Sequence, residues 1–129
     1  NREIMVEAGA IKTLLQMLTA SGQLNSHQAA ALAFFNFSTY PQNHSALIQE
    51  LVHKSLFVLC SSPDVAVRKY SIMTLCNLAA NNATREETSK GGGLQSAIRL
   101  LRDKDQDCRL YSIVCLANLS NHSKMQSQV

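Results

Sequence analysis

Three asparagines, Asn36, Asn77 and Asn118, recur at a regular interval and are the main candidates for a binding role in this chain. Each lies between hydrophobic residues, and consecutive asparagines are 41 residues apart. A carboxamide carries an acceptor and two donors, which matches the C=O and N–H groups of a peptide bond. Helix propensity does not favour asparagine inside an apolar helix. Two hypotheses follow: these side chains bond to the backbone of neighbouring helices, or they face outward to bind another chain.

The other reactive residue types form no recognised pattern. The four histidines share no metal-ligand spacing with cysteine or aspartate. We therefore expect them to be solvated or to cap helices. The glycine run 91–93 lacks the lysine and hydroxyl residue of a phosphate loop and predicts a helix break. The four cysteines form no CxxC pair and are expected to be reduced and buried. We therefore expect no enzyme activity, no cofactor and no metal.

Composition predicts a soluble helical protein. Hydrophobic residues make up 46% of the 129 residues and charged residues 16%, which argues against disorder. The net charge of +3 is small, and lysine and arginine are scattered, so we expect no nucleic-acid partner. No apolar run is long enough to cross a bilayer. With the reduced cysteines, this favours a cytoplasmic and also a nuclear location.

Apolar periodicity predicts that three similar groups of helices position the asparagines. A short helical turn is expected at 1–7, and longer helices at 10–18, 26–38, 43–51, 53–60, 64–79, 84–90, 94–102 and 106–120. Ser26 is the expected N-cap of the second of these longer helices. The register divides the chain 1–129 into repeat 1 (1–41), repeat 2 (42–82), repeat 3 (83–120) and the start of a further repeat (121–129).

A period of 41 residues, three helices per unit and an asparagine near the end of the third helix resemble the armadillo repeat. The resemblance rests on Gly9-Ala10-Ile11, Gly92-Gly93-Leu94, Asp64 before Val65-Ala66-Val67, and the three endings N-F-S, N-L-A and N-L-S. The middle unit differs, because Leu51-Val52 stands where glycine is expected. HEAT repeats have a similar period but two helices and no terminal asparagine, so they are the second choice. The resemblance implies an all-α, right-handed α-solenoid of three armadillo-type three-helix repeats.

The resemblance also implies a non-catalytic protein–protein interaction scaffold. Its third helices would line a concave groove in which the asparagines bind the backbone of an extended peptide segment. Side chains four, seven and eight positions before an asparagine share or border its helical face and would supply specificity. They include Leu32, Met73, Val114, Tyr70, Tyr111, Gln28 and Lys69. The chain has no tryptophan, which argues against recognition of nuclear-import signals and favours apolar, tyrosine-lined pockets.

Several structural alternatives remain open at this point. The asparagines could hold the register between repeats, and the two tyrosines could pack between repeats with the hydroxyl at the rim. Arg68 and Arg109 lie opposite the asparagines and are expected to pair with acidic side chains or cap carbonyls. A second functional hypothesis is assembly, in which exposed repeat ends associate with one another and the chain self-associates.

Overall fold

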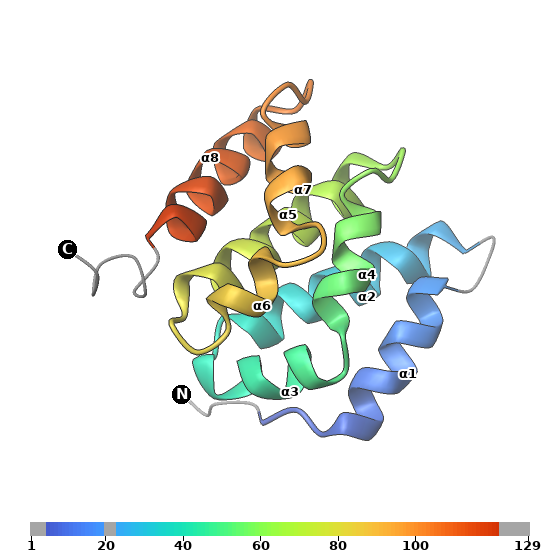
Figure 1. Cartoon of the computed structure of the whole chain (residues 1–129). Helices are drawn as coiled ribbons and strands as arrows, with labels where there is room; N and C mark the ends of the chain where they lie inside the picture. The colour runs from blue at the N-terminus through green and yellow to red at the C-terminus, as the bar shows by residue number, and fades with distance from the viewer. Residues whose placement is uncertain (1–4, 20–22, 122–129) are drawn as a thin grey trace.

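The computed structural model describes residues 5–19 and 23–121, and every regular element in these ranges is helical (Figure 1). The elements are α1 (Ala8–Thr19), α2 (Leu24–Ser38), the 3₁₀ helix η1 (Pro41–Asn43), α3 (His44–Gln49), α4 (Val52–Leu59), α5 (Val65–Ala80), α6 (Arg85–Ser89), α7 (Gly93–Leu100) and α8 (Gln106–Ser120). We call α1–α2 the first unit, η1–α5 the second unit and α6–α8 the third unit.

The long helices that end each unit stack side by side. Helix α5 packs between α2 and α8, and α1, α4 and α7 each pack against the long helix of their own unit. Helix α1 lies at one end of the stack and α8 at the other (Figure 1). Buried apolar side chains from all three units fill the space between the layers, among them Phe34, Leu56, Leu75 and Leu100. The core is therefore continuous along the stack, as repeat architectures require.

Two aspartates begin the long helices of the second and third units. Asp64 accepts the Val67 N–H at 2.9 Å, and Asp105 accepts the Cys108 N–H at 2.9 Å. A side-chain oxygen at this position satisfies an amide that has no partner within the helix. The first long helix has no such cap: it begins at Leu24 after Gln23, whose side chain makes no capping bond. The prediction of Ser26 as N-cap is wrong, because the helix begins two residues earlier.

The short helices cap the helix that precedes them. Asn43 donates from Nδ2 to the Phe37 carbonyl at 3.1 Å, and Thr84, 41 residues later, donates to the Leu78 carbonyl at 2.7 Å. The buried guanidinium of Arg85 donates to the Ala79 carbonyl at 2.7 Å and to further carbonyls at the ends of α5 and α8. Carbonyls at a helix C-terminus lack partners inside the helix, so each unit satisfies the end of its neighbour.

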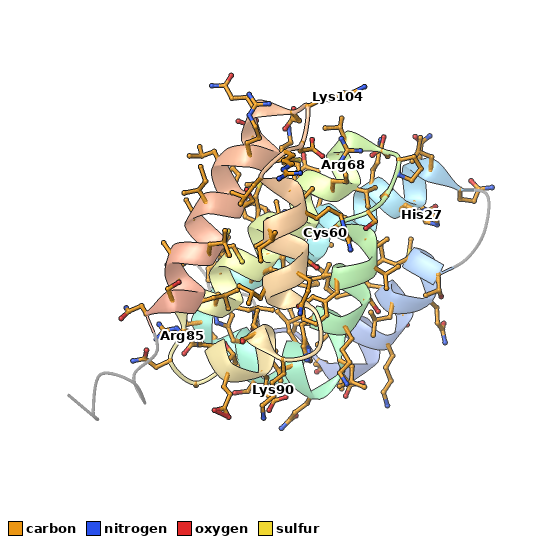
Figure 2. All side chains as sticks on the ribbon, turned by 45° about the horizontal axis from the view of Figure 1, so that its top comes forward. His27, Cys60, Arg68, Arg85, Lys90 and Lys104 are labelled. Atoms are coloured by element: carbon orange, nitrogen blue, oxygen red, sulfur yellow. The ribbon has the colours of Figure 1, made fainter. Side chains whose placement is uncertain are left out.

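The arginines at the other end of the long helices bridge neighbouring units. Arg68 forms a two-bond fork with Asp103 of the third unit, at 2.9 and 3.2 Å, and also donates to two backbone carbonyls. Arg109 donates to the Asp103 and Lys104 carbonyls at 2.8 and 3.0 Å. Both arginines thus fill the predicted roles. Figure 2 shows Arg68 and Arg85 at opposite ends of the stacked helices.

The expected helix bounds differ from the structure by at most two residues, apart from the start of the chain. Residues 5–7 are not helical, so the predicted turn at 1–7 is wrong there, and its residues 1–4 lie outside the described ranges. Residues 122–129, expected to begin a further repeat, also lie outside them. Leu51 takes the left-handed conformation, with φ 61° and ψ 30°, at the position where glycine was expected. The second unit therefore has a left-handed residue directly before α4 without the glycine that suits this conformation, whereas its counterpart Gly92 has φ 161°.

Candidate functional site

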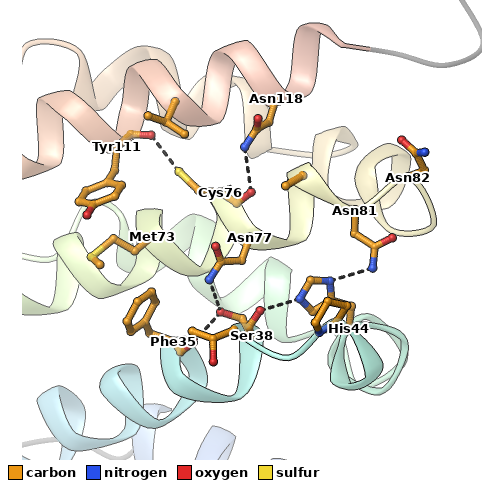
Figure 3. Close-up of a pocket in the computed structure, with 14 residues that line it drawn as sticks. Phe35, Ser38, His44, Met73, Cys76, Asn77, Asn81, Asn82, Tyr111 and Asn118 are labelled. Atoms are coloured by element: carbon orange, nitrogen blue, oxygen red, sulfur yellow. Dashed lines mark hydrogen bonds between the residues drawn. The ribbon is translucent and has the colours of Figure 1, made fainter. Parts of the chain in front are cut away.

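A cavity of about 760 Å³ lies over the C-terminal halves of the three long helices (Figure 3). We call it the third-helix cavity. Helix α2 and the turn after it form one wall, α5 the floor, and α8 the other wall. Met73, Asn77, Tyr111, Val114 and Asn118, all predicted from the sequence, line it. The structure therefore brings five of the ten predicted binding residues together on one concavity.

Asn77 and Asn118, the two of the 41-residue series that line the cavity, each use one donor to hold the neighbouring unit. Asn77 donates from Nδ2 to the Ser38 hydroxyl at 2.9 Å, and Ser38 in turn donates to the Phe35 carbonyl at 2.7 Å. Asn118 donates directly to the Cys76 carbonyl at 3.1 Å. Cys76 lies 41 residues after Phe35, so both asparagines address the same backbone position, one through a hydroxyl and one directly (Figure 3).

The presence or absence of a hydroxyl at the position of Ser38 explains whether the asparagine bonds to the carbonyl through a hydroxyl or directly. Ser38 is followed 41 residues later by Ala79, which has no hydroxyl to place between Asn118 and the carbonyl. In both cases Oδ1 accepts no hydrogen bond from the described part of the chain, and the side chain is half-buried. A single asparagine can therefore serve both hypotheses. Its amide N–H₂ donates to the neighbouring unit and holds the register, and its carbonyl oxygen can accept a hydrogen bond from a bound chain.

Asn36 differs from the other two asparagines. It is exposed, because within the described residues no unit precedes the first one, and its side chain makes no hydrogen bond there. It does not line the third-helix cavity. The 41-residue ladder is thus continuous in sequence, but the asparagine at its start lacks the neighbour that holds the others.

The cavity is lined by apolar and polar side chains without acidic residues, lysine or arginine. Its apolar surface comes from Phe35, Met73, Val114 and the Tyr111 ring, and its polar surface from amides, hydroxyls and the His44 imidazole. None of the lining residues is an aspartate, glutamate, lysine or arginine. Placing a charged side chain there would cost desolvation free energy without an ionic partner, so the cavity fits uncharged side chains and peptide groups.

The other predicted residues do not line the cavity. The Tyr70 ring stacks on Phe35, with centroids 6.2 Å apart and planes at 27°. Lys69 forms an ion pair with Asp107 at 3.7 Å. Gln28 donates from Nε2 to both carboxylate oxygens of Asp64 at 3.1 Å. Leu32 is 38% exposed on α2. Gln28 and Lys69 thus both contact acidic side chains of the following unit.

Sequence reasoning missed a histidine–asparagine pair at the edge of the cavity. Asn81 accepts the Ala83 N–H with Oδ1 at 2.9 Å, which leaves Nδ2 to donate to His44 Nδ1 at 2.9 Å. The His44 Nε2–H then donates to the Ser38 carbonyl at 2.6 Å. In this arrangement Nδ1 of His44 accepts a hydrogen bond and Nε2 donates one. The signal was available, because His44 and the capping Arg85 are 41 residues apart.

The cysteines are free and buried, as predicted. Cys76 borders the cavity and donates from Sγ to the Tyr111 carbonyl at 2.9 Å. A hydrogen bond with Cys115, together with burial, raises the pKa of the Cys76 thiol. Burial also raises the pKa of the Cys108 thiol to about 12. These thiols stay protonated at neutral pH and act as packing groups rather than nucleophiles.

The described residues contain no cluster of three or more histidine, cysteine, aspartate or glutamate side chains that could hold a metal ion. Over the same ranges, no helix combines the length and apolar character needed to span a bilayer.

Comparisons with known proteins agree on the fold. No family model matches the chain. It is 25% identical over 115 residues, or 88% of its length, to the human Armadillo repeat-containing protein 3, and spans 13% of that protein. A designed armadillo repeat protein in complex with the peptide (KR)4 superposes with a TM-score of 0.82 at 20% identity, over 93% of this chain and 51% of the other. The crystal structure of an engineered protein superposes with a TM-score of 0.78 at 22% identity, over 88% of this chain and 28% of the other.

Proposed function

Because this chain has the armadillo-repeat fold, as predicted, we propose that it is a non-catalytic scaffold that binds an extended segment of a partner protein in the third-helix cavity. The solved relative that holds a peptide on the same fold supports a protein partner. The observation that carries the proposal is the pair of half-buried asparagines, Asn77 and Asn118, which line the cavity and whose Oδ1 atoms accept no hydrogen bond from the described residues.

The asparagines suit a peptide backbone because of their spacing. Neighbouring packed helices lie about 9 to 10 Å apart, and an extended chain advances about 3.3 Å per residue. Successive asparagines therefore address peptide N–H groups two to three residues apart in the partner. Since the N–H₂ of each asparagine is already fixed by the preceding helix, its Oδ1 is oriented before the partner arrives, which lowers the ordering cost of binding.

The cavity lining indicates which partner segments fit. Phe35, Met73, Tyr111 and Val114 offer an apolar pocket, and no carboxylate is present in the lining to receive lysine or arginine. The relative that binds (KR)4 takes a strongly basic peptide, which this lining does not suit. We propose that the segment places an uncharged apolar or aromatic side chain between the asparagine positions, with Tyr70 and Lys69 at the rim.

The test is selection of binders from a displayed library of random dodecapeptides, followed by calorimetric titration of the enriched peptide. We expect the double variant Asn77→Ala/Asn118→Ala to weaken binding at least tenfold. Val58→Ala is the control, because Val58 is 73% exposed and does not line the cavity. The charged peptide (KR)4 should bind more weakly than the selected peptide. Unchanged affinity of a correctly folded double variant, or selection of basic peptides only, would contradict the proposal.

A further inference from the structure

A second concavity lies between α4 and α7, the middle helices of the second and third units. Its volume is about 530 Å³, and it shares no lining residue with the third-helix cavity. Helices α4 and α7 pack side by side (Figure 1). We call this concavity the α4–α7 groove; its walls include Phe57, Val58 and Ser61 on one side and Gly92, Ser96 and Arg99 on the other.

Contacts between the two walls hold the groove in shape. Arg99 donates from Nη1 to the Ser61 hydroxyl, and Ser96 donates from Oγ to the Phe57 carbonyl at 3.5 Å. A Cβ on Gly92 would lie 2.6 Å from the Phe57 ring, so this glycine lets the ring lie against the start of α7. The groove therefore exists before a ligand arrives, which lowers the ordering cost of binding.

The residues that give the groove its character do not recur in the second unit. Leu51 and Val58 stand 41 positions before Gly92 and Arg99. Leu51 is 52% exposed and Val58 is 73% exposed. The second unit thus has two aliphatic side chains where the third unit has a glycine and a cation. The α4–α7 groove is consequently a feature of this sequence and not of the repeat pattern.

Arg99 gives the groove an unbalanced positive charge. Among the described residues that line the groove, Arg99 alone is charged. It is exposed, and none of the ion pairs among the described residues includes it, whereas Arg68 is paired with Asp103. Only one of its N–H groups is used, by the Ser61 hydroxyl. The others can bind a carboxylate in the fork geometry that arginine favours.

An apolar surface lies at the other end of the groove. The half-buried Phe57 ring lies against Gly92, and Val58 stands exposed beside it. Gly92 and Arg99 are seven residues apart along α7, which corresponds to about 10 Å. An extended peptide covers that length in about three residues. The groove therefore fits an apolar side chain and a carboxylate at that separation.

We propose that the α4–α7 groove binds an acidic, extended peptide segment of a partner protein. The segment packs an aromatic or aliphatic side chain on Phe57 and Val58 and, about three residues away, places an aspartate or glutamate on Arg99. The proposal concerns a different surface from the third-helix cavity and stands independently of peptide binding there.

The experiment is selection from a displayed library of random octapeptides, with the Asn77→Ala/Asn118→Ala chain as bait to disable the third-helix cavity. The enriched peptides are then titrated by calorimetry. We expect them to share an acidic residue three positions from an aromatic or aliphatic one. Their affinity should fall when NaCl is raised from about 50 to 300 mM, because Arg99 is exposed and its ion pair is screened.

Variants locate the bound peptide. Arg99→Gln should weaken binding at least tenfold, whereas Arg102→Gln, an exposed arginine outside the groove, should change it less than twofold. Arg99→Glu should bind the peptide whose acidic residue is replaced by lysine. Val58→Ala should weaken the octapeptides about threefold but leave a peptide in the third-helix cavity unaffected. Melting temperatures should stay unchanged, because these side chains are exposed.

Three results would overturn the proposal. The first is a selection that enriches no octapeptide over an unrelated helical bait, or enriches peptides without acidic residues. The second is an equal loss of affinity in Arg99→Gln and Arg102→Gln, which would indicate general attraction to a positively charged chain. The third is a concentration-dependent dimer in light scattering that Arg99→Glu abolishes, since that result would assign the groove to a second copy.

Discussion

At the scale of single residues, two side chains occupy positions that do not suit them. His53 is 1% exposed, and neither ring nitrogen has a hydrogen-bond partner among the described residues. Its ring meets Phe57 edge to face, with centroids 5.8 Å apart. Leu51 is left-handed, a conformation that costs a residue with a Cβ about 1–2 kcal/mol. The counterparts of these two residues in the third unit are Leu94 and Gly92, so the second unit is the one that departs from the pattern.

His53 should make stability fall as the pH is lowered. Desolvation lowers the pKa of His53 below its usual value of 6.5, although nearby Glu87 acts in the opposite direction. The unfolded chain therefore binds a proton first, and the free energy of unfolding decreases below about pH 6.5, by at most about 1.4 kcal/mol per pH unit for this group. In urea unfolding we expect the His53→Leu variant to be more stable than the unsubstituted chain at pH 5.5. Between pH 7.5 and 5.5 the variant should also lose less free energy of unfolding than the unsubstituted chain. An identical pH dependence in both proteins would contradict this account.

Leu51→Gly should stabilise the chain by about 1 kcal/mol, because glycine adopts the left-handed conformation without steric cost. Leu51 is 52% exposed, so little packing is lost. Leu51→Ala keeps the Cβ and serves as the control, for which we expect no gain in the melting temperature by calorimetry. Equal effects of glycine and alanine would show that the backbone conformation is not the cause.

At the scale of helices, close backbone approach fixes the junction between α6 and α7. A Cβ built on Gly93 would lie 2.0 Å from the Thr88 carbonyl oxygen, and one on Gly92 would lie 2.6 Å from the Phe57 ring. The equivalent of Gly93 in the second unit is Val52, which is fully buried and begins α4. The two units therefore join their first and second helices differently, as the absence of glycine at Leu51-Val52 predicted.

Gly93→Ala should accordingly destabilise the chain by about 1–3 kcal/mol. The added Cβ would clash with the Thr88 carbonyl, which cannot move without disturbing α6. Gly9→Ala is the matched control: nothing lies within 4 Å of its Cβ, and it is inside helix α1, where alanine is favoured. Chemical denaturation of the two variants should separate them clearly. Comparable stability of the two variants would argue against the tight junction.

The elements themselves were largely predictable from the sequence, and the reasons are local. Apolar periodicity located every described α-helix but not the 3₁₀ helix η1, and Asp64 marked the start of α5 because its side chain caps the helix directly. The start of α2 was predicted two residues too late. No side chain caps the helix, so Ser26 was the best capping residue that the sequence offered there. Bonds between units were harder to predict. Whether Asn77 reaches a carbonyl directly or through Ser38 depends on how two helices meet in space.

At the scale of the whole molecule, stacking of similar helical units generates the cavity. Stacking α2, α5 and α8 places Asn77 and Asn118 along one concave side, where each fixes its amide on the preceding helix. Five of the ten residues predicted from the sequence line the cavity. The sequence did not predict that Phe35, Ser38 and His44 complete the lining, because they come from positions that vary between units.

The most direct measurement of the central claim is a titration of ¹⁵N-labelled chain with a selected peptide, monitored through the side-chain amide resonances of asparagine. Bonding of a partner N–H to Oδ1 polarises the carboxamide, so the N–H₂ signals of Asn77 and Asn118 should shift with saturation at one equivalent. The signal of Asn36, which lies outside the cavity, should shift much less. Saturable binding that leaves the Asn77 and Asn118 signals in place would contradict the claim that these asparagines hold the partner.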